Sequence, residues 1–174
     1  MKDKTNMNRE TWISLAMENH ESMLLSYAFN ICGNYERAQD IVQDTFLKLC
    51  KADMQKVDIY LKAWLFKVCR NRALEIIRKE RKMQPLTDEQ LNKEASNTSS
   101  PYDKIDRSEQ FTKMLSFVDE LPKKQKEVVF LKFKSELTYK EISEVADISI
   151  SNVGVILHTA IGKLRTKMRN NIEY

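Results

Sequence analysis

Apolar residues recur at helical spacing along most of the chain, and this pattern predicts an all-α fold. In the N-terminal half it predicts helices near residues 8–31, 36–51 and 59–82, with the first stripe interrupted at 19–20, helix-ending residues at 32–34 and a loop at 51–58. The inward positions expected on these helices are Leu15, Met23, Leu24, Tyr27, Ala28, Ile31, Ala38, Ile41, Val42, Phe46, Leu49, Cys50, Leu61, Leu65, Val68, Leu74 and Ile77. Only three glycines and three prolines occur, and no stretch shows the sustained alternation of a strand.

The C-terminal half contains a pattern typical of a helix-turn-helix. Residues 137–165, LTYKEISEVADISISNVGVILHTAIGKLR, predict a short helix, a tight turn and a longer helix. Thr138 and Glu141 have the spacing of a capping box, Asp147 tolerates the positive φ that the turn needs, and Ser149 or Ser151 can cap the second helix. Its buried stripe is predicted as Val153, Ile156, Leu157, Ala160, Ile161 and Leu164. Any amphipathic helix pair is the plainer interpretation, but these three signals in register favour DNA binding.

A polar segment divides the chain into two small domains. Residues 84–101, QPLTDEQLNKEASNTSSP, contain two of the three prolines and end in Ser, Asn and Thr, a composition that predicts an exposed linker. We therefore expect a helical domain at 8–83, a flexible linker at 84–103 and a second helical domain at 104–170.

Positive charge is concentrated in two blocks, although the net charge of the chain is only +4. Residues 62–82 hold eight Lys or Arg against two Glu, and residues 123–169 hold ten against five acidic residues. Two basic blocks suggest two separate contacts with polyanions. In the first block, Lys and Arg residues alternate with aromatic residues. This mixture suits nucleic acid, because cations bind phosphates and aromatic rings stack on unpaired nucleobases. For Trp64 alone, a core position is the simpler interpretation. Trp64 and Phe66 point in different directions on the helix, so we do not expect both in one buried layer.

Several classes of function have no support in the sequence. Cys32, Cys50 and Cys69 lack paired-ligand spacing and lie in apolar stripes, so they are read as reduced core residues of a cytosolic protein. With only His20 and His158 available, no zinc ligand set is convincing, and we expect no metal or other cofactor. The polar start MKDKTNMNRE predicts no signal peptide, and no apolar run is long enough to insert in a membrane. No catalytic motif appears, which argues against an enzyme.

Three segments, in this order, carry a resemblance to a known family. AQDIVQDTFLKLCK at 38–51, AWLFKVCRNRALEIIRK at 63–79 and the helix-turn-helix resemble the bacterial sigma-70 family of RNA polymerase sigma factors. They resemble in particular its small extracytoplasmic-function (ECF) group, which keeps only sigma regions 2 and 4. The segment before the helix-turn-helix, DELPKKQKEVVFLKF at 119–133, is also similar, with Pro122 at a helix start. The resemblance covers nearly all of the chain after about residue 18 and places the linker where the family has it.

The resemblance implies three surfaces and a set of partners. It implies a soluble, cytoplasmic transcription initiation factor that binds the bacterial RNA polymerase core enzyme and promoter DNA, melts that DNA without ATP, and is often held by an anti-sigma factor. The residues that match the core-polymerase-binding segment are Asp40, Gln43, Asp44 and Lys48. Those expected along the minus-ten element are Trp64, Lys67, Arg70, Asn71, Arg78 and Lys79, with a pocket for a flipped base near residues 51–59. Those expected at the minus-thirty-five element are Lys140, Ser149, Ser151, Asn152, Gly154, His158, Lys163 and Arg165.

One departure from the family pattern concerns the second helix of the helix-turn-helix. Where the family usually has basic or hydroxyl residues, this chain has Gly154, Val155 and Ile156, and it has Thr159 where a further Arg is usual. Gly154 either lets the helix backbone approach DNA closely, which we prefer, or accommodates a neighbouring helix. We expect weak DNA binding by this domain alone, with affinity coming from engagement at two sites.

Two other classes of protein remain possible from the sequence. A stand-alone helix-turn-helix transcriptional regulator would dimerise or bind a ligand through its N-terminal half, but it leaves the aromatic and basic third helix unexplained. A helical adaptor that does not bind DNA would leave the two basic blocks unexplained. Co-purification with core polymerase separates the sigma-factor interpretation from both.

Overall fold

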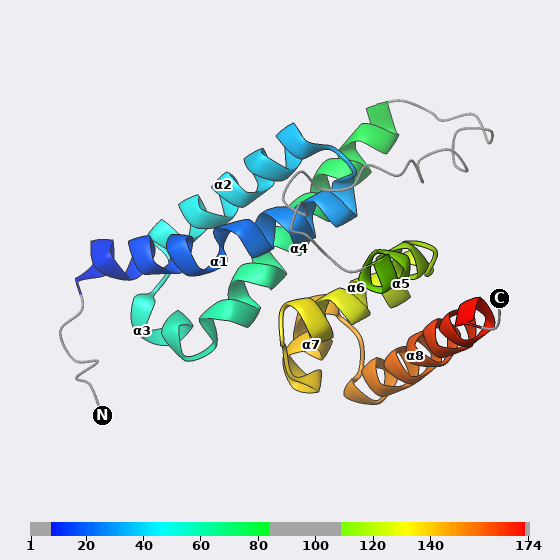
Figure 1. The fold of residues 1–174 in the computed structure, drawn as a ribbon. Helices are drawn as coiled ribbons and strands as arrows, with labels where there is room; N and C mark the ends of the chain where they lie inside the picture. Colours follow the sequence, from blue (N-terminus) through cyan, green and yellow to red (C-terminus); the bar gives the residue numbers. More distant parts are fainter. Residues whose placement is uncertain (1–7, 84–108, 173–174) are drawn as a thin grey trace. The chain divides into compact units, whose positions relative to one another are not determined.

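The computed structural model describes residues 8–83 and 109–172, and the chain divides into two compact units, Met1–Ser100 and Pro101–Tyr174. The described residues of both units are helical, without a strand among them, so the predicted all-α fold is confirmed (Figure 1). The whole of the predicted linker, residues 84–103, lies outside the described residues.

Three long helices form the first unit. They are α1 (Arg9–Cys32), α2 (Tyr35–Lys51) and α4 (Leu61–Met83), and each packs against the other two (Figure 1). The sequence predicts where α1 ends, because Gly33 adopts the left-handed conformation, with φ 68°, and donates its N–H to the carbonyl of Phe29. Asn34 then caps α2 by accepting the N–H of Arg37 at 2.9 Å. As predicted, α1 is one helix whose apolar stripe is interrupted at Asn19, an exposed residue whose amide donates to the Leu15 carbonyl one turn earlier.

The predicted loop at 51–58 is wrong. It contains the short helix α3 (Met54–Val57) and runs into a 3-10 turn, η1 (Asp58–Tyr60). Asp53 caps α3, and the indole N–H of Trp12 donates to the carboxylate of Asp58 at 2.9 Å. Trp12 is buried at the start of α1, so a contact between residues 46 positions apart holds this segment in place.

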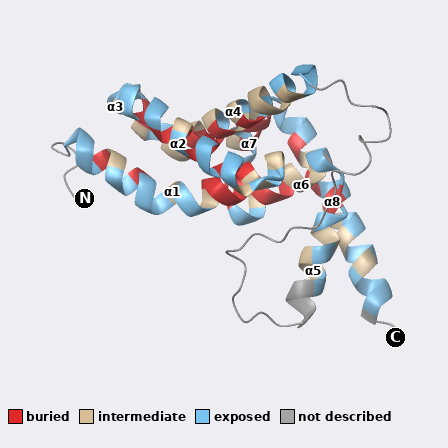
Figure 2. Cartoon of the chain, turned by 90° about the horizontal axis from the view of Figure 1, so that it is seen from above, coloured by how far each residue is buried: buried red, intermediate tan, exposed pale blue. Residues whose placement is uncertain are grey.

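The core of the first unit lies where its three long helices face one another (Figure 2). Tyr27 and Phe66 meet there edge to face, with ring centroids 5.1 Å apart. Most predicted inward residues are buried or half-buried, but Leu15, Cys50 and Leu74 are exposed. Each stands one residue from a buried position (Ala16, Leu49 and Ala73), and one residue turns a helix by about 100°. The predicted core position of Cys50 is therefore wrong, whereas Cys69 is buried and Cys32 half-buried.

Residues 109–172 of the second unit form four α-helices and a π-helical turn. They are α5 (Glu109–Asp119), α6 (Lys123–Val129), the π-helical η3 (Phe130–Lys134), α7 (Tyr139–Ala146) and α8 (Ile150–Ile172). The predicted helix-turn-helix is α7 and α8. The capping box of Thr138 and Glu141 is complete, Asp147 adopts φ 55°, and the Ser149 hydroxyl accepts the N–H of Asn152 at 3.2 Å. All three local predictions are confirmed, with Ser149 rather than Ser151 as the cap.

The core of the second unit lies between α8 and the helices before it. Its fully buried residues include Val128, Leu131, Ile142, Val153, Leu157 and Ala160, while Ile156, Ile161 and Leu164 of the predicted α8 stripe are half-buried. In the parts of the chain that the structure describes, no single helix has both the length and the apolar character to cross a membrane; α7 and α8 meet that test only when counted together across a 100° bend.

Candidate nucleic-acid and protein interfaces

The outer side of α2 is a compact polar surface. Asp40, Gln43 and Lys48, which the family resemblance assigns to polymerase binding, are exposed on the side of α2 away from its buried stripe. Leu47 stands among them, i+4 from Gln43, and 55 % of it is exposed. Leu47 is not among the predicted contacts, which are all polar, although its spacing from Gln43 places it on the same side. We call Asp40, Gln43, Leu47 and Lys48 the α2 face.

Asp44, the fourth predicted polymerase contact, is engaged inside the unit. Its carboxylate accepts a hydrogen bond from Nε of Arg72 on α4 at 2.6 Å, and 36 % of its side chain is exposed. Arg72 also donates to Glu75 at 3.2 Å, and Glu75 pairs with Lys79 at 2.7 Å. The hydrogen bond that Arg72 donates to Asp44 raises the pKa of Arg72, and the hydrogen bonds from Lys79 and then Arg72 lower the pKa of Glu75. A chain of four charges therefore connects α2 to α4.

The outer side of α4 brings together most of the predicted minus-ten residues. Trp64, Lys67, Asn71 and Arg78 follow one another at spacings of three, four and seven residues, which keeps them on one side of a helix. Lys67, Asn71 and Arg78 are exposed and Trp64 is half-buried, whereas Phe66 is fully buried, so the two aromatics do lie in different layers. We call these four residues, together with the exposed Leu74, the α4 face.

Arg70 and Lys79, the two remaining minus-ten candidates, lie on opposite flanks of the α4 face. Arg70 is half-buried, and the ammonium group of Lys79 is held by Glu75 one turn earlier. Before the start of α4, the segment expected to hold a flipped base, residues 51–59, ends at Ile59, which is 86 % exposed, and the next residue, Tyr60, is 45 % exposed. An apolar and an aromatic side chain are therefore available there for stacking.

Most of the predicted minus-thirty-five residues lie on the open side of α8. Ser149, Ser151, Asn152, His158 and Arg165 are exposed, as is Lys140 on α7. Lys163 is exposed too, but its ammonium group donates to the Gln125 side chain at 3.2 Å. A Cβ added to Gly154 would lie 3.8 Å from Cε2 of Tyr139, an ordinary van der Waals distance. Packing against α7 therefore does not require glycine at this position.

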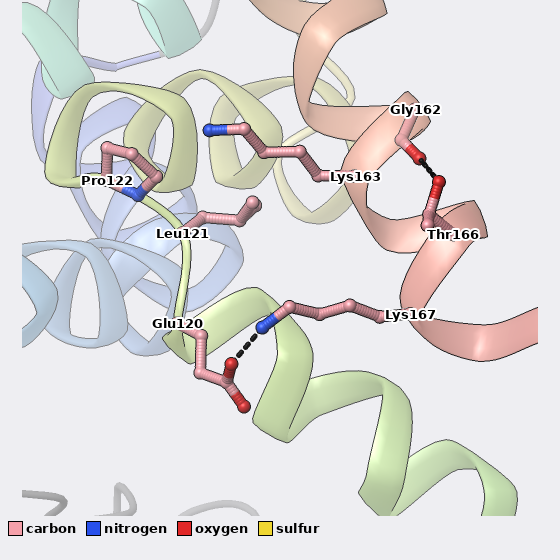
Figure 3. A pocket seen from close by; sticks show the side chains of 7 residues that line it. All are labelled: Glu120, Leu121, Pro122, Gly162, Lys163, Thr166 and Lys167. Atoms are coloured by element: carbon pink, nitrogen blue, oxygen red, sulfur yellow. Dashed lines mark hydrogen bonds and ion pairs between the residues drawn. The ribbon is translucent and has the colours of Figure 1, made fainter. Parts of the chain in front are cut away.

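A groove between the α5–α6 turn and α8 has a volume of about 620 Å³. Lys167 reaches across it to form an ion pair with Glu120, and Lys163 lies beside Pro122 (Figure 3). The residues that line it are Glu120, Leu121, Pro122, Gly162, Lys163, Thr166 and Lys167. Its lysines are thus held within the unit, which fastens α8 to the preceding turn.

Burial shifts the pKa of titratable side chains in the first unit. Burial raises the pKa of the Cys69 thiol to about 12, which keeps it protonated and unreactive at neutral pH. Burial, and then the charge of Lys62, lowers the pKa of His20. Within residues 8–83 and 109–172, no three His, Cys, Asp or Glu side chains come together as a set of metal ligands.

Comparison with known proteins identifies both units. The first matches the family model of sigma-70 region 2 over residues 16–83, and the second matches that of sigma-70 region 4 over residues 117–166. The ECF RNA polymerase sigma factor SigM of Bacillus subtilis (strain 168) is 31 % identical over 133 residues, which cover 74 % of this chain and 77 % of SigM. RNA polymerase sigma factor SigV of the same organism is 25 % identical over 150 residues, or 86 % of each chain.

A solved structure shares the fold. The sigma factor RpoE of Bartonella quintana, solved in complex with the anti-sigma factor NepR, superposes with a TM-score of 0.60 at 19 % identity, covering 92 % of this chain and 96 % of RpoE. The helical units and the matched regions together show that this chain belongs to the sigma-70 family. Within that family it is an RNA polymerase sigma factor of the ECF type, which directs core polymerase to promoters. The stand-alone regulator has no support, because the N-terminal unit matches sigma region 2.

Proposed function

We propose that three surfaces of this sigma factor divide promoter recognition between them. Residues 8–83 bind the polymerase core enzyme through the α2 face and the minus-ten element through the α4 face. Residues 104–170 bind the minus-thirty-five element through the start of α8 and are joined to the first domain by residues 84–103. The observation that carries the proposal is the α4 face, where an aromatic ring, an amide and two cations share one side of a helix over about four turns.

Strand opening follows from differential binding. The α4 face offers Lys67 and Arg78 to phosphates, and Trp64 and Asn71 to an unstacked base. A surface that binds the separated strand more tightly than the duplex shifts the opening equilibrium by that difference in free energy. No ATP and no catalytic residue are needed, so the chain acts as a non-enzymatic factor in the cytoplasm.

The α2 face suits a helical partner. Leu47 supplies apolar contact area at its centre, and Asp40, Gln43 and Lys48 surround it with polar groups, the usual arrangement of a protein interface. The Asp44 carboxylate has capacity for a second donor beyond Arg72, because an ionised carboxylate has about four acceptor sites. We assign this surface to the core polymerase, and we assign an anti-sigma factor as an inhibitor that covers the exposed faces.

Run-off transcription with purified core enzyme on a promoter library tests the DNA assignment. Start sites that depend on this chain should disappear with Asn71→Ala and persist with Asn30→Ala, which removes an exposed amide from α1. Equal initiation by the two variants would refute the role of the α4 face.

Pulldown of core polymerase tests the docking assignment. Asp40→Ala and Leu47→Ala should each weaken the complex by about tenfold, equivalent to roughly 1.4 kcal/mol. Glu21→Ala, which removes an exposed carboxylate from α1, should leave it unchanged. An inhibitor assignment predicts that a stoichiometric protein co-purifies with the chain from its native host; if none does, that part of the proposal fails.

A further inference from the structure

The outward side of α8 is apolar at its centre. Val155 is 63 % exposed, although it lies between polar positions one turn away on either side. Ser151 and Asn152 precede it by four and three residues, and His158 and Thr159 follow it by three and four, so these four exposed residues surround it on the helix surface. An exposed valine inside a polar ring has no role in the core of the unit.

The surrounding groups leave Val155 as the most prominent feature of this side. The hydroxyl of Thr159 donates to the Val155 carbonyl at 2.9 Å, so its proton is already used within the helix. Gly154, next to Val155, has no side chain, and the contact with Tyr139 does not require that absence. Position 154 itself therefore leaves the helix backbone beside Val155 bare, with the Tyr139 ring of α7 as its neighbour.

A particular base edge fits this geometry. In the major groove, only thymine presents an apolar group, its 5-methyl, while the other base edges present hydrogen-bond donors and acceptors. A β-branched apolar side chain that has no polar atom gains from contact with that methyl and loses from desolvating a polar edge. The polar ring around Val155 meanwhile suits the neighbouring bases and phosphates.

We propose that Val155 reads the methyl group of one thymine in the minus-thirty-five element. The inference rests on the proposed function, because it requires the start of α8 to enter the major groove. It assigns specificity at one base pair to an apolar contact, at the point where the family pattern has basic or hydroxyl residues. The element bound by this chain therefore contains a thymine, on one strand or the other, opposite Val155.

Replacement of thymidine by deoxyuridine tests this contact, since the bases of the two nucleosides, thymine and uracil, differ only in the 5-methyl group. Holoenzyme formed from core polymerase and the full chain first selects a duplex from a library randomised over the upstream element. Duplexes with deoxyuridine at one thymine at a time are then compared by equilibrium binding. One replacement should weaken binding about fourfold, the value of burying one methyl-sized group. With Val155→Ser, the thymine and deoxyuridine duplexes should bind equally at that position.

Ile150→Ser is the matched control, because Ile150 is 51 % exposed on the same helix but is rotated away from Val155. It should leave the deoxyuridine effect at the Val155 position intact. If no replacement weakens binding while Arg165→Ala still does, α8 binds DNA but the methyl contact does not exist, and only this inference fails. If the holoenzyme selects no upstream sequence at all, the proposed function of α8 fails together with it.

Discussion

The two units of this sigma factor use their positive charge differently. In the region 2 unit, Lys67 and Arg78 lie exposed on the α4 face beside an aromatic ring and an amide. In the region 4 unit, Lys126 pairs with Asp119, Lys167 with Glu120, and Lys163 with Gln125. Helix α8 thus begins with hydroxyl, amide and apolar groups, and Lys163 and Lys167 farther along it are held by partners within the unit.

This difference agrees with the division of promoter binding that we propose above. A separated strand must be held against re-pairing, which requires exposed cations and stacking partners. A duplex is already formed, so the unit that reads it needs shape and base-edge contacts more than a large electrostatic attraction. We therefore expect the region 2 unit to contribute most of the salt-dependent affinity and the region 4 unit to contribute sequence selection.

The largest effect should come from removing the exposed cations of the α4 face. Lys67→Ala combined with Arg78→Ala should lower promoter affinity at least about tenfold and reduce the slope of log K against log salt by about 1.4, as expected for two phosphate contacts on a single strand. Lys123→Ala with Lys124→Ala removes the same charge from exposed positions on α6. If salt titrations of holoenzyme binding give both double variants the same slope, the cations of the two units contribute equally, and the expected difference between the units does not exist.

A change at Gly154 should separate stability from DNA binding in the region 4 unit. Gly154→Ala should raise the free energy of unfolding by about 1 kcal/mol, because alanine is the better helix former and the added Cβ meets Tyr139 at an ordinary distance. If the bare backbone approaches DNA, the same variant should bind the upstream duplex several-fold more weakly. Urea denaturation followed by circular dichroism, with anisotropy of a labelled duplex, measures both.

Gly162→Ala provides the matched control for Gly154→Ala. It lies on the same helix, and a Cβ there would have no neighbour within 4 Å. It should give a similar gain in stability with no loss of duplex affinity. Equal affinities for the two variants would show that the glycine at 154 does not serve DNA approach.

Local signals explain most of what the sequence predicted correctly. The capping box, the positive φ of Asp147, the Ser149 cap and the glycine end of α1 each depend on residues within one turn of each other. The spacing of the α4 face likewise follows from helical periodicity alone. These features need no knowledge of what packs against them.

Long-range contacts explain what the sequence did not predict. The helical turn at 54–60 is anchored by Trp12, 46 residues from Asp58, and the Asp44 carboxylate is engaged by Arg72, 28 residues away. No pattern in the neighbouring sequence predicts the contact of Trp12 with Asp58 or that of Asp44 with Arg72. The wrong core assignments of Cys50 and Leu74 arise because the apolar stripe is wider than the strip that the neighbouring helices cover.

A smaller effect is expected from the ion pair that joins the two surfaces of the region 2 unit. Asp44→Asn, Arg72→Met and the double variant form a cycle whose coupling should be about 0.5–1 kcal/mol in urea unfolding, as for other partly exposed pairs. Polymerase affinity separates two roles for Asp44. If the carboxylate contacts polymerase itself, Asp44→Asn should weaken docking more than Arg72→Met does; equal losses would make Asp44 only a structural partner of Arg72.

The smallest effect should be a pH dependence that belongs to the region 2 unit. Burial and Lys62 lower the pKa of His20 in the folded state, whereas in the unfolded chain it takes up a proton at its ordinary value of 6.5. Below that pH the unfolded state binds more protons than the folded state. The free energy of unfolding is therefore at its full value above about pH 6.5 and decreases as the pH falls. The lowered pKa of Glu75 acts in the same direction, but only below its ordinary value of 4.5. His20→Gln should therefore flatten the decrease between pH 7 and 5.5.

Tryptophan fluorescence can assign this effect to one unit, because both tryptophans of the chain, Trp12 and Trp64, lie in the region 2 unit. Urea unfolding followed by their emission should show the decrease toward pH 5.5 in the parent chain and in His158→Gln, which removes the other histidine from the other unit, but not in His20→Gln. A decrease that survives His20→Gln would mean that His20 remains accessible to protons in the folded unit. The pH dependence would then come from other titratable groups of the region 2 unit, because the two tryptophans report the unfolding of that unit.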